Sequence, residues 1–136
     1  MKVQFALLAQ SASIDRFSNR LSVFNLLESI ESQSFPVFIP EVVFVCILRR
    51  EAGDLVVSDG TLSVFSGDSI VGKANVRVDF ESAQHSRLIV NFQPVPLMKP
   101  ENLRFQLDVT NGPTYSLDIP VTQTKPAPAP LPAPGD

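Results

Sequence analysis

The sequence predicts an all-β protein, an antiparallel β-sandwich of about seven or eight strands over residues 1–123 followed by a flexible tail. Apolar residues recur at every second position over 74–80, 103–109 and 115–121, which is the period of a strand with one buried face. The run VVFVCIL at 42–48 is apolar on both faces, which predicts a central strand covered by a second layer. Because each apolar face needs a facing layer, two packed sheets are the simplest arrangement.

Turn residues mark the connections between these strands. Asn111-Gly112-Pro113 predicts a hairpin between the last two strands, with Gly112 supplying a positive φ. Asp59-Gly60 predicts a second turn. The segment from Phe35 to Pro40 is bracketed by two prolines, so we expect an extended connection or a sheet edge, where missing N–H donors are tolerated.

Two segments allow more than one interpretation. Over residues 22–32 the apolar positions fit a helical stripe as well as a strand with a bulge or kink, and we favour the strand. The opening MKVQFALLAQSA has features of a secretory signal. Its apolar run is short, however, and the alternation Val3, Phe5, Leu7 favours a half-buried first strand.

The chain is long enough and apolar enough to form one hydrophobic core. It has 136 residues, of which 44% are hydrophobic and 18% are charged. Folding at this size removes roughly two-thirds of the unfolded surface from water, so no disulfide or metal is needed for stability. We expect the core to include Val45, Phe80, Phe105, Leu107 and Leu117.

The charge and the cysteine count exclude several kinds of partner and location. A net charge of −3 argues against nucleic acid, because phosphate binding needs a positive face. No segment approaches the roughly 20 apolar residues of a membrane-spanning helix, so we expect no membrane partner. Cys46 is the single cysteine, which rules out an internal disulfide and favours a reducing, cytoplasmic location.

The order of motifs along the first part of the chain is similar to that of a known family. An alternating first strand leads into Ile14-Asp15, a polar turn at residues 16–20, the run LSVFNLLESI, and then FPVFIPEVVFVCIL. This order resembles a family of small bacterial proteins filed as domain of unknown function 6941, over residues 3–121. The resemblance implies a single β-sandwich domain and supplies no activity. The turn departs from the family pattern, because Arg16-Phe17-Ser18-Asn19 replaces a glycine-containing turn. Asn19 can adopt a positive φ in place of the glycine.

The polar cluster Asp15, Arg16, Asn19 and Arg20 is the first candidate site. Asp and Asn are favoured in turns because their side chains bond to nearby backbone groups. We therefore interpret the cluster as a turn with Arg16 and Arg20 in solvent. The alternative is a small anion or carboxylate held by the two arginines.

No other pattern indicates catalysis or ligand binding. His85 is the single histidine and lies in a polar stretch, so we expect a solvated loop residue rather than a metal ligand or general base. Cys46 lies between Val45 and Ile47, so we expect a buried, inert thiol rather than a nucleophile. Scattered aspartates and isolated glycines match neither a calcium loop nor a phosphate-binding loop. We therefore assign no catalytic, cofactor-binding or metal-ligating residue and expect no enzyme.

The preferred interpretation is a non-enzymatic module that has a structural role or binds a protein partner whose identity the sequence does not give. The alternative is a small-ligand-binding or enzymatic domain with a site built from loops. We expect a monomer or a weak homodimer formed through a sheet edge that proline does not protect. Prolines protect the edges near residues 94–96 and 113–120, which leaves the first strand and Leu62–Phe65 unprotected.

The Pro/Ala-rich stretch at residues 124–136 is interpreted as a flexible tail outside the domain, suited to act as a spacer. Its prolines fall at every second position, so no two lie three residues apart and the stretch contains no PxxP ligand.

Deleting residues 124–136 should change the melting temperature by no more than about a degree, because Leu131 is the one large apolar side chain available to offset the entropy of ordering the tail. Thermal denaturation of the full and shortened chains checks this. A drop of several degrees would show that the tail packs on the domain.

Overall fold

The computed structural model describes residues 1–125, and this part of the chain contains twelve strands and no helix. No helical membrane span is therefore present among these residues. The strands are β1 (Lys2–Ile14), β2 (Leu21–Leu26), β3 (Ile30–Ser32), β4 (Val37–Ile39), β5 (Val42–Arg49), β6 (Val57–Ser66), β7 (Ser69–Asp79), β8 (His85–Phe92), β9 (Val95–Leu97), β10 (Leu103–Val109), β11 (Thr114–Ile119) and β12 (Val121–Gln123). The all-β prediction is confirmed. Residues 126–136 of the predicted tail lie outside the described residues.

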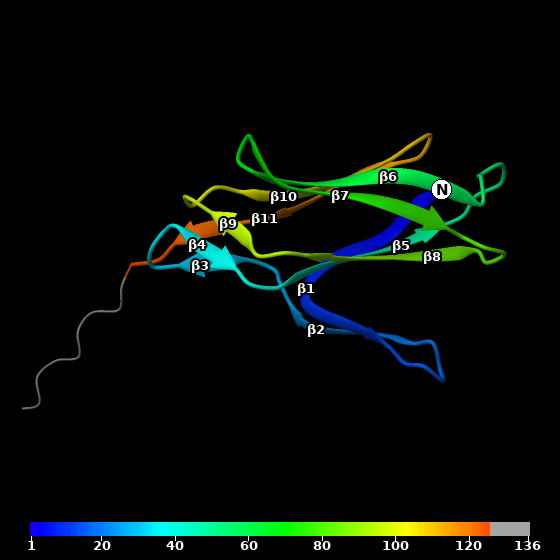
Figure 1. Cartoon of the computed structure of the whole chain (residues 1–136), viewed down its shortest axis with the longest axis horizontal. Helices are drawn as coiled ribbons and strands as arrows, with labels where there is room; N and C mark the ends of the chain where they lie inside the picture. Colours follow the sequence, from blue (N-terminus) through cyan, green and yellow to red (C-terminus); the bar gives the residue numbers. More distant parts are fainter. Residues whose placement is uncertain (126–136) are drawn as a thin grey trace, which may run out of the picture.

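Eight of the strands form two four-stranded antiparallel sheets that lie as two layers (Figure 1). One sheet has the order β2-β1-β5-β8 and the other has the order β11-β10-β6-β7. The remaining four strands are short and pair in twos, β4 with β9 antiparallel and β3 with β12 parallel. The strand count exceeds the predicted seven or eight because breaks such as Pro120 divide predicted strands into shorter ones.

The hydrophobic core lies between the two large sheets. Phe105 of β10 occupies its centre, stacked on Phe44 of β5 with ring centroids 6.2 Å apart. It also makes a T-shaped contact with Phe92 of β8, with ring centroids 5.5 Å apart. Phe80 and Leu107 are buried in the same cluster, as the sequence predicted, whereas Leu117 is half-buried at its margin.

Strand β5 is buried on both faces. Phe44, Cys46 and Leu48 point into the core between the sheets. Alternate side chains of a strand point to opposite faces, so Val43 and Val45 lie on the outer face of the sheet. Their exposed fractions are nevertheless 4% and 0%, so a second layer must cover them. Val45 is therefore buried as predicted, but outside the central core.

The hairpin of β1 and β2 supplies this second layer. Residues 2–9 of β1 pair with β5, whereas residues 9–14 pair with β2, and Figure 1 shows this second half folded back beneath the sheet. Two hollows have one wall from the hairpin and the other from the sheet, which places the hairpin over the outer face. Ile14 shares one of these hollows with Ile47, and Ala12 shares the other with Val43.

Two of the turn predictions were wrong in detail. Asp59 and Gly60 lie within β6, where a Cβ on Gly60 would sit 2.7 Å from the main-chain oxygen of Asp108, so glycine is needed for close strand packing rather than for a turn. The β6–β7 turn instead uses Gly67, with φ 57°. The hairpin at residues 111–113 is confirmed, but Asn111, with φ 56°, takes the positive φ that was assigned to Gly112.

The N-terminal strand is confirmed, but its predicted alternation is wrong. A register shift between Val3 and Phe5 interrupts the β1–β5 pairing. Val3 therefore packs on the core, whereas Phe5 pairs with Ile47 on the outer face and is 42% exposed.

The segments at 22–32 and 35–40 form strands, as favoured. Residues 22–32 contribute to β2 and β3, with Asn25 at φ 56° marking a kink near the end of β2. The segment from Phe35 to Pro40 contains β4, which pairs with β9.

The prediction of unprotected edges was wrong for Leu62–Phe65, because β6 lies between β10 and β7. For the first strand it holds in part: β1 pairs with β5 only as far as Ala9, and its second half pairs with β2 alone, which leaves one edge of that half unpaired. The edges of the two large sheets are β2, β8, β7 and β11. Sequence order could not identify the edges because it does not show which strands become neighbours.

Replacing Phe105 by alanine should destabilise the protein by about 3 to 5 kcal/mol, because it removes the side chain that joins the two sheets and leaves a cavity. Ser116→Ala is the matched control, since Ser116 is exposed on neighbouring β11 and its loss should change stability by less than about 0.5 kcal/mol. Urea denaturation measures both variants. Similar midpoints for both would contradict this placement of the core.

Candidate functional site

The tip of the β1–β2 hairpin is a hydrogen-bonded turn. Asp15 Oδ1 accepts hydrogen bonds from the N–H groups of Phe17 and Ser18, each 2.8 Å long. These bonds, the one from Ser18 above all, lower the pKa of the Asp15 carboxyl. Asn19 has φ 58°, which confirms its expected role in place of glycine.

The two arginines of this turn lie in solvent. Arg16 and Arg20 are both exposed, and neither takes part in an ion pair within residues 1–125. The hydrogen bonds to Asp15 and the φ of Asn19 confirm the turn interpretation of the cluster.

A different arginine connects this turn to the sheet. Arg87 of β8 pairs with Ile47 and so lies on the outer face, beneath the hairpin. Its guanidinium donates one hydrogen bond of 2.7 Å to the main-chain oxygen of Asn19 and another of 3.3 Å to Asn19 Oδ1. Arg87 thus holds the tip of the hairpin over the sheet.

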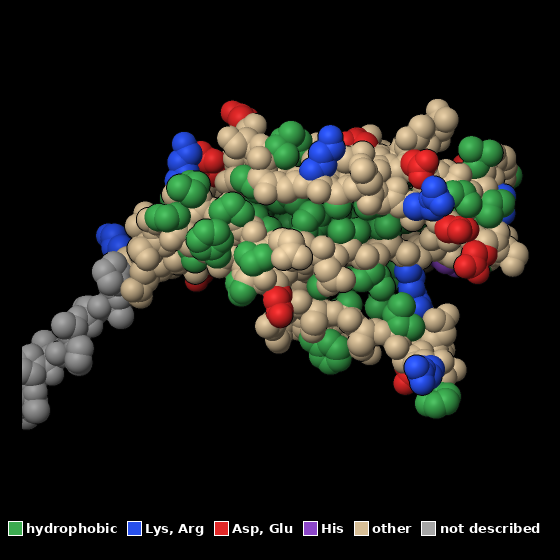
Figure 2. Space-filling view, viewed as in Figure 1, with side chains coloured by type: hydrophobic (Ala, Val, Ile, Leu, Met, Phe, Trp, Pro, Cys, Tyr) green, Lys and Arg blue, Asp and Glu red, His purple; other side chains and the backbone are tan. Residues whose placement is uncertain are grey.

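The space between the hairpin and the sheet is a cleft of about 600 Å³. Figure 2 shows it as a wedge open to solvent between the hairpin and the body of the molecule. Polar side chains of both signs line it, including Asp79, Glu81, His85 and Arg87. His85 is exposed, as expected, but it opens strand β8 instead of lying in a loop. No three His, Cys, Asp or Glu side chains in residues 1–125 gather closely enough to hold a metal ion.

The outer side of the hairpin exposes large apolar side chains. Phe24 and Leu26 of β2 are 50% and 51% exposed, and Phe17 at the tip is 95% exposed. Figure 2 shows hydrophobic side chains on a hairpin that stands off from the rest of the molecule. A projecting element with several exposed apolar groups is typical of a contact surface for another molecule.

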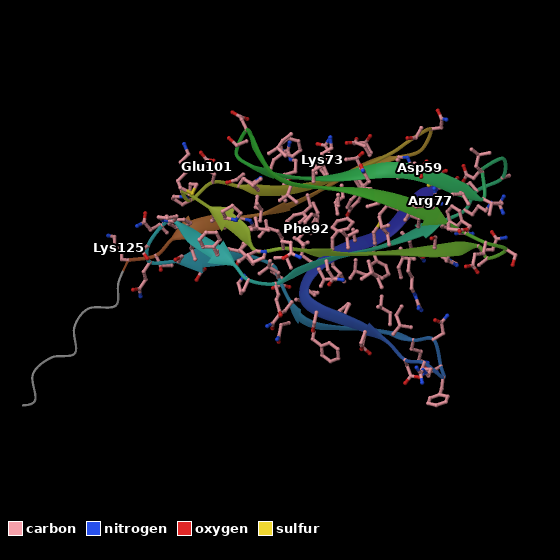
Figure 3. All side chains as sticks on the ribbon, in the orientation of Figure 1. Asp59, Lys73, Arg77, Phe92, Glu101 and Lys125 are labelled. Atoms are coloured by element: carbon pink, nitrogen blue, oxygen red, sulfur yellow. The ribbon has the colours of Figure 1, made fainter. Side chains whose placement is uncertain are left out.

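The free edge of β2 is also chemically different from the outer edges of β7, β8 and β11 and from the short strands. Its sequence LSVFNL contains no charged residue and no proline. The other outer strands of the two large sheets carry charges: Lys73 and Arg77 on β7 (Figure 3), Arg87 on β8 and Asp118 on β11. The short strands carry a charge or lie beside proline, as the sequences at Glu31, Pro36–Pro40, Pro94–Pro96 and Pro120 show.

Charge and proline protect a sheet edge from pairing with another chain. β2 therefore combines unprotected main-chain groups with exposed apolar side chains. We call β2 together with Phe17 the hairpin surface.

Two further groups of exposed apolar residues lack this combination. Leu55 and Val56 lie in the connection before β6, so they offer no free strand edge. Phe38 and Met98 lie near β4 and β9, whose edges are bounded by proline. The hairpin surface is consequently the stronger candidate.

A comparison with protein families supports the grouping suggested by the motifs. The model described as "Family of unknown function (DUF6941)" matches residues 4–122. The chain belongs to this family. No curated protein matches it. The matched region covers all of β1–β11 apart from the first residues of β1, so the hairpin surface is part of the DUF6941 domain.

The sequence analysis did not identify the hairpin surface of the DUF6941 domain. It placed the unprotected edge at the first strand and not at β2, and it gave no role to Arg87. The absence of charge and proline from LSVFNL is a signal that could have been found. Nothing in the sequence around Arg87 indicates that it reaches residue 19.

Cys46 of the DUF6941 domain is fully buried, as predicted. Burial raises the pKa of its thiol from 9.0 to about 12. Between these two pKa values the native state keeps the thiol neutral, whereas the unfolded chain ionises it. The stabilisation of the native state that comes from burying the neutral thiol is therefore fully present below pH 9 and is lost as the pH rises toward 12.

A thiol reagent at pH 8 should label the folded DUF6941 domain far more slowly than the denatured chain, because Cys46 is buried and protonated. The signal reports on Cys46 alone, since the chain has no other cysteine. Equal labelling rates in the folded and denatured states would show that Cys46 is accessible.

Proposed function

We propose that this domain is a non-enzymatic module that binds a protein partner through the hairpin surface. The observation that carries the proposal is the free edge of β2, which has neither charge nor proline and lies beside the exposed Phe24 and Leu26. The partner contributes an extended apolar segment that adds to the sheet as a further strand.

The two kinds of group on the hairpin surface have complementary roles in such a complex. The main-chain N–H and C=O groups of β2 supply hydrogen bonds that any extended chain can match, and these give affinity. Apolar side chains such as Phe24 select the partner by the fit of its side chains. Because Arg87 holds the hairpin tip through Asn19, part of the ordering cost of binding is already met in the free protein.

The cleft under the hairpin supports the alternative of a small-ligand site less well. A ligand site needs polar groups that converge on an enclosed space. Here the cleft is open, its charges are of both signs, and both terminal nitrogens of Arg87 already bond to Asn19. We also propose a reducing, cytoplasmic location, which the single buried Cys46 supports.

A photo-cross-linking amino acid at Phe24, in the full chain expressed in its own host, should yield an adduct of one defined mass. The matched control places the same amino acid at Asn75, which is exposed on the charged edge β7 and should give no such adduct. Ser22→Lys in the Phe24 cross-linking chain should abolish the adduct, because lysine on an edge blocks strand pairing.

Either of two results would contradict the proposal. One is equal labelling from positions 24 and 75, and the other is an adduct that persists when Ser22 is replaced by lysine. Mass spectrometry of the adduct identifies the captured chain.

A further inference from the structure

We infer that the partner of β2 is a second copy of this chain, paired with it in an antiparallel arrangement about a two-fold axis at Ser22. This inference rests on the proposed function, because it names the occupant of the same edge. It follows from the main-chain pattern of β2 and from the side chains that this pattern brings together.

The hydrogen bonds to β1 determine which residues of β2 are free to pair. Asp15 N–H donates to the main-chain oxygen of Arg20, so Arg20 directs its main-chain groups toward β1. The direction alternates along an antiparallel strand, so Ser22 also faces β1, whereas Leu21 and Val23 direct their N–H and C=O groups to the free edge.

These two residues determine the register. Asn25 has φ 56°, so the regular part of the strand ends at Phe24. A second copy can satisfy the free groups of Leu21 and Val23 together when Leu21 of one copy lies opposite Val23 of the other. The two-fold axis then passes through Ser22, and the two strands exchange four main-chain hydrogen bonds.

The side chains in this register are compatible on both faces of the extended sheet. On one face Leu21 lies beside Val23 of the second copy, which pairs two half-buried aliphatic groups. On the other face the small Ser22 meets its own counterpart, and Phe24 lies beside Arg20 of the second copy, a pairing that favours a cation–π contact. No like charges are brought opposite each other.

A second copy fits β2 better through its own β2 than through β7, β8 or β11. Those three edges carry charged residues that would face the uncharged β2. Pairing β2 with β2 also uses both open edges at once, so assembly stops at a dimer instead of growing into a filament. The contact is short compared with the roughly 1,200–2,000 Å² buried in stable complexes, so the association is weak.

Sedimentation equilibrium of the full chain, from about 10 μM to about 1 mM, should show an average mass that rises from one chain toward two. Ser22→Lys should weaken this association by about tenfold or more, because it places two lysines opposite each other at the axis. Ser13→Lys is the matched control: Ser13 is exposed directly across from Ser22 but on β1, one strand away from the proposed contact, and its replacement should leave the association unchanged.

A second measurement tests the register. In the proposed dimer Ser22 and its counterpart form a non-hydrogen-bonded pair, the kind in which side chains lie closest. Ser22→Cys should therefore form a disulfide-linked dimer under mild oxidation much faster than Ser13→Cys. The buried Cys46 does not compete in either variant.

The inference is overturned if the chain remains a monomer over the whole concentration range, if Ser13→Lys weakens association as much as Ser22→Lys, or if the two cysteine variants oxidise at equal rates. A monomeric chain whose position 24 cross-links to a different protein would overturn the second copy as partner while supporting the proposed function. A monomeric chain with no cross-link from position 24 would overturn both.

Discussion

The burial of β5 on both faces is the constraint from which most of this structure follows. Its alternating side chains are apolar toward the core and apolar toward the outside, so covering one face with the second sheet leaves Val43 and Val45 exposed to water. Leaving a side chain of this size in water forgoes roughly 1.5 to 3 kcal/mol of burial free energy. A second cover on the outer face is therefore favoured, and the nearest available element is the continuation of β1.

Covering that face determines the shape of the N-terminal hairpin. β1 must pair with β5 over its first half and then leave the sheet, so its second half can pair with β2 alone. The turn at Asp15–Arg20 reverses the chain, and Arg87 ties the turn to the strand on the far side of β5. Cys46 lies on the opposite face of β5, buried between the two sheets, so the one thiol of the chain is excluded from surface chemistry.

The functional consequence is that the free edge and outer side of β2 take no part in the hydrophobic core. The inner side of the hairpin covers the sheet, while Phe24 and Leu26 of β2 remain exposed on the outside. The edges β7, β8 and β11 and the short strands have charge or proline against unwanted pairing, and β2 does not. An unprotected edge that lies beside exposed apolar side chains is the physical basis for the proposed interaction.

The sequence by itself determined the all-β class, the family, the position of most strands, the buried Cys46 and the turn at Asp15 and Asn19. These are properties of local spacing: a period of two, a residue type suited to positive φ, or an apolar run can be recognised without knowing which segments become neighbours. It could not show that Gly60 lies inside a strand, because the reason is an approach of β10 from far along the chain. Nor could it show that β2 is the open edge or that Arg87 reaches Asn19 across 68 positions. Strand order and side-chain contacts depend on which distant segments pair, and this pairing depends on how the apolar faces of the whole chain are covered. For this reason only the tertiary structure decided where the candidate surface lies.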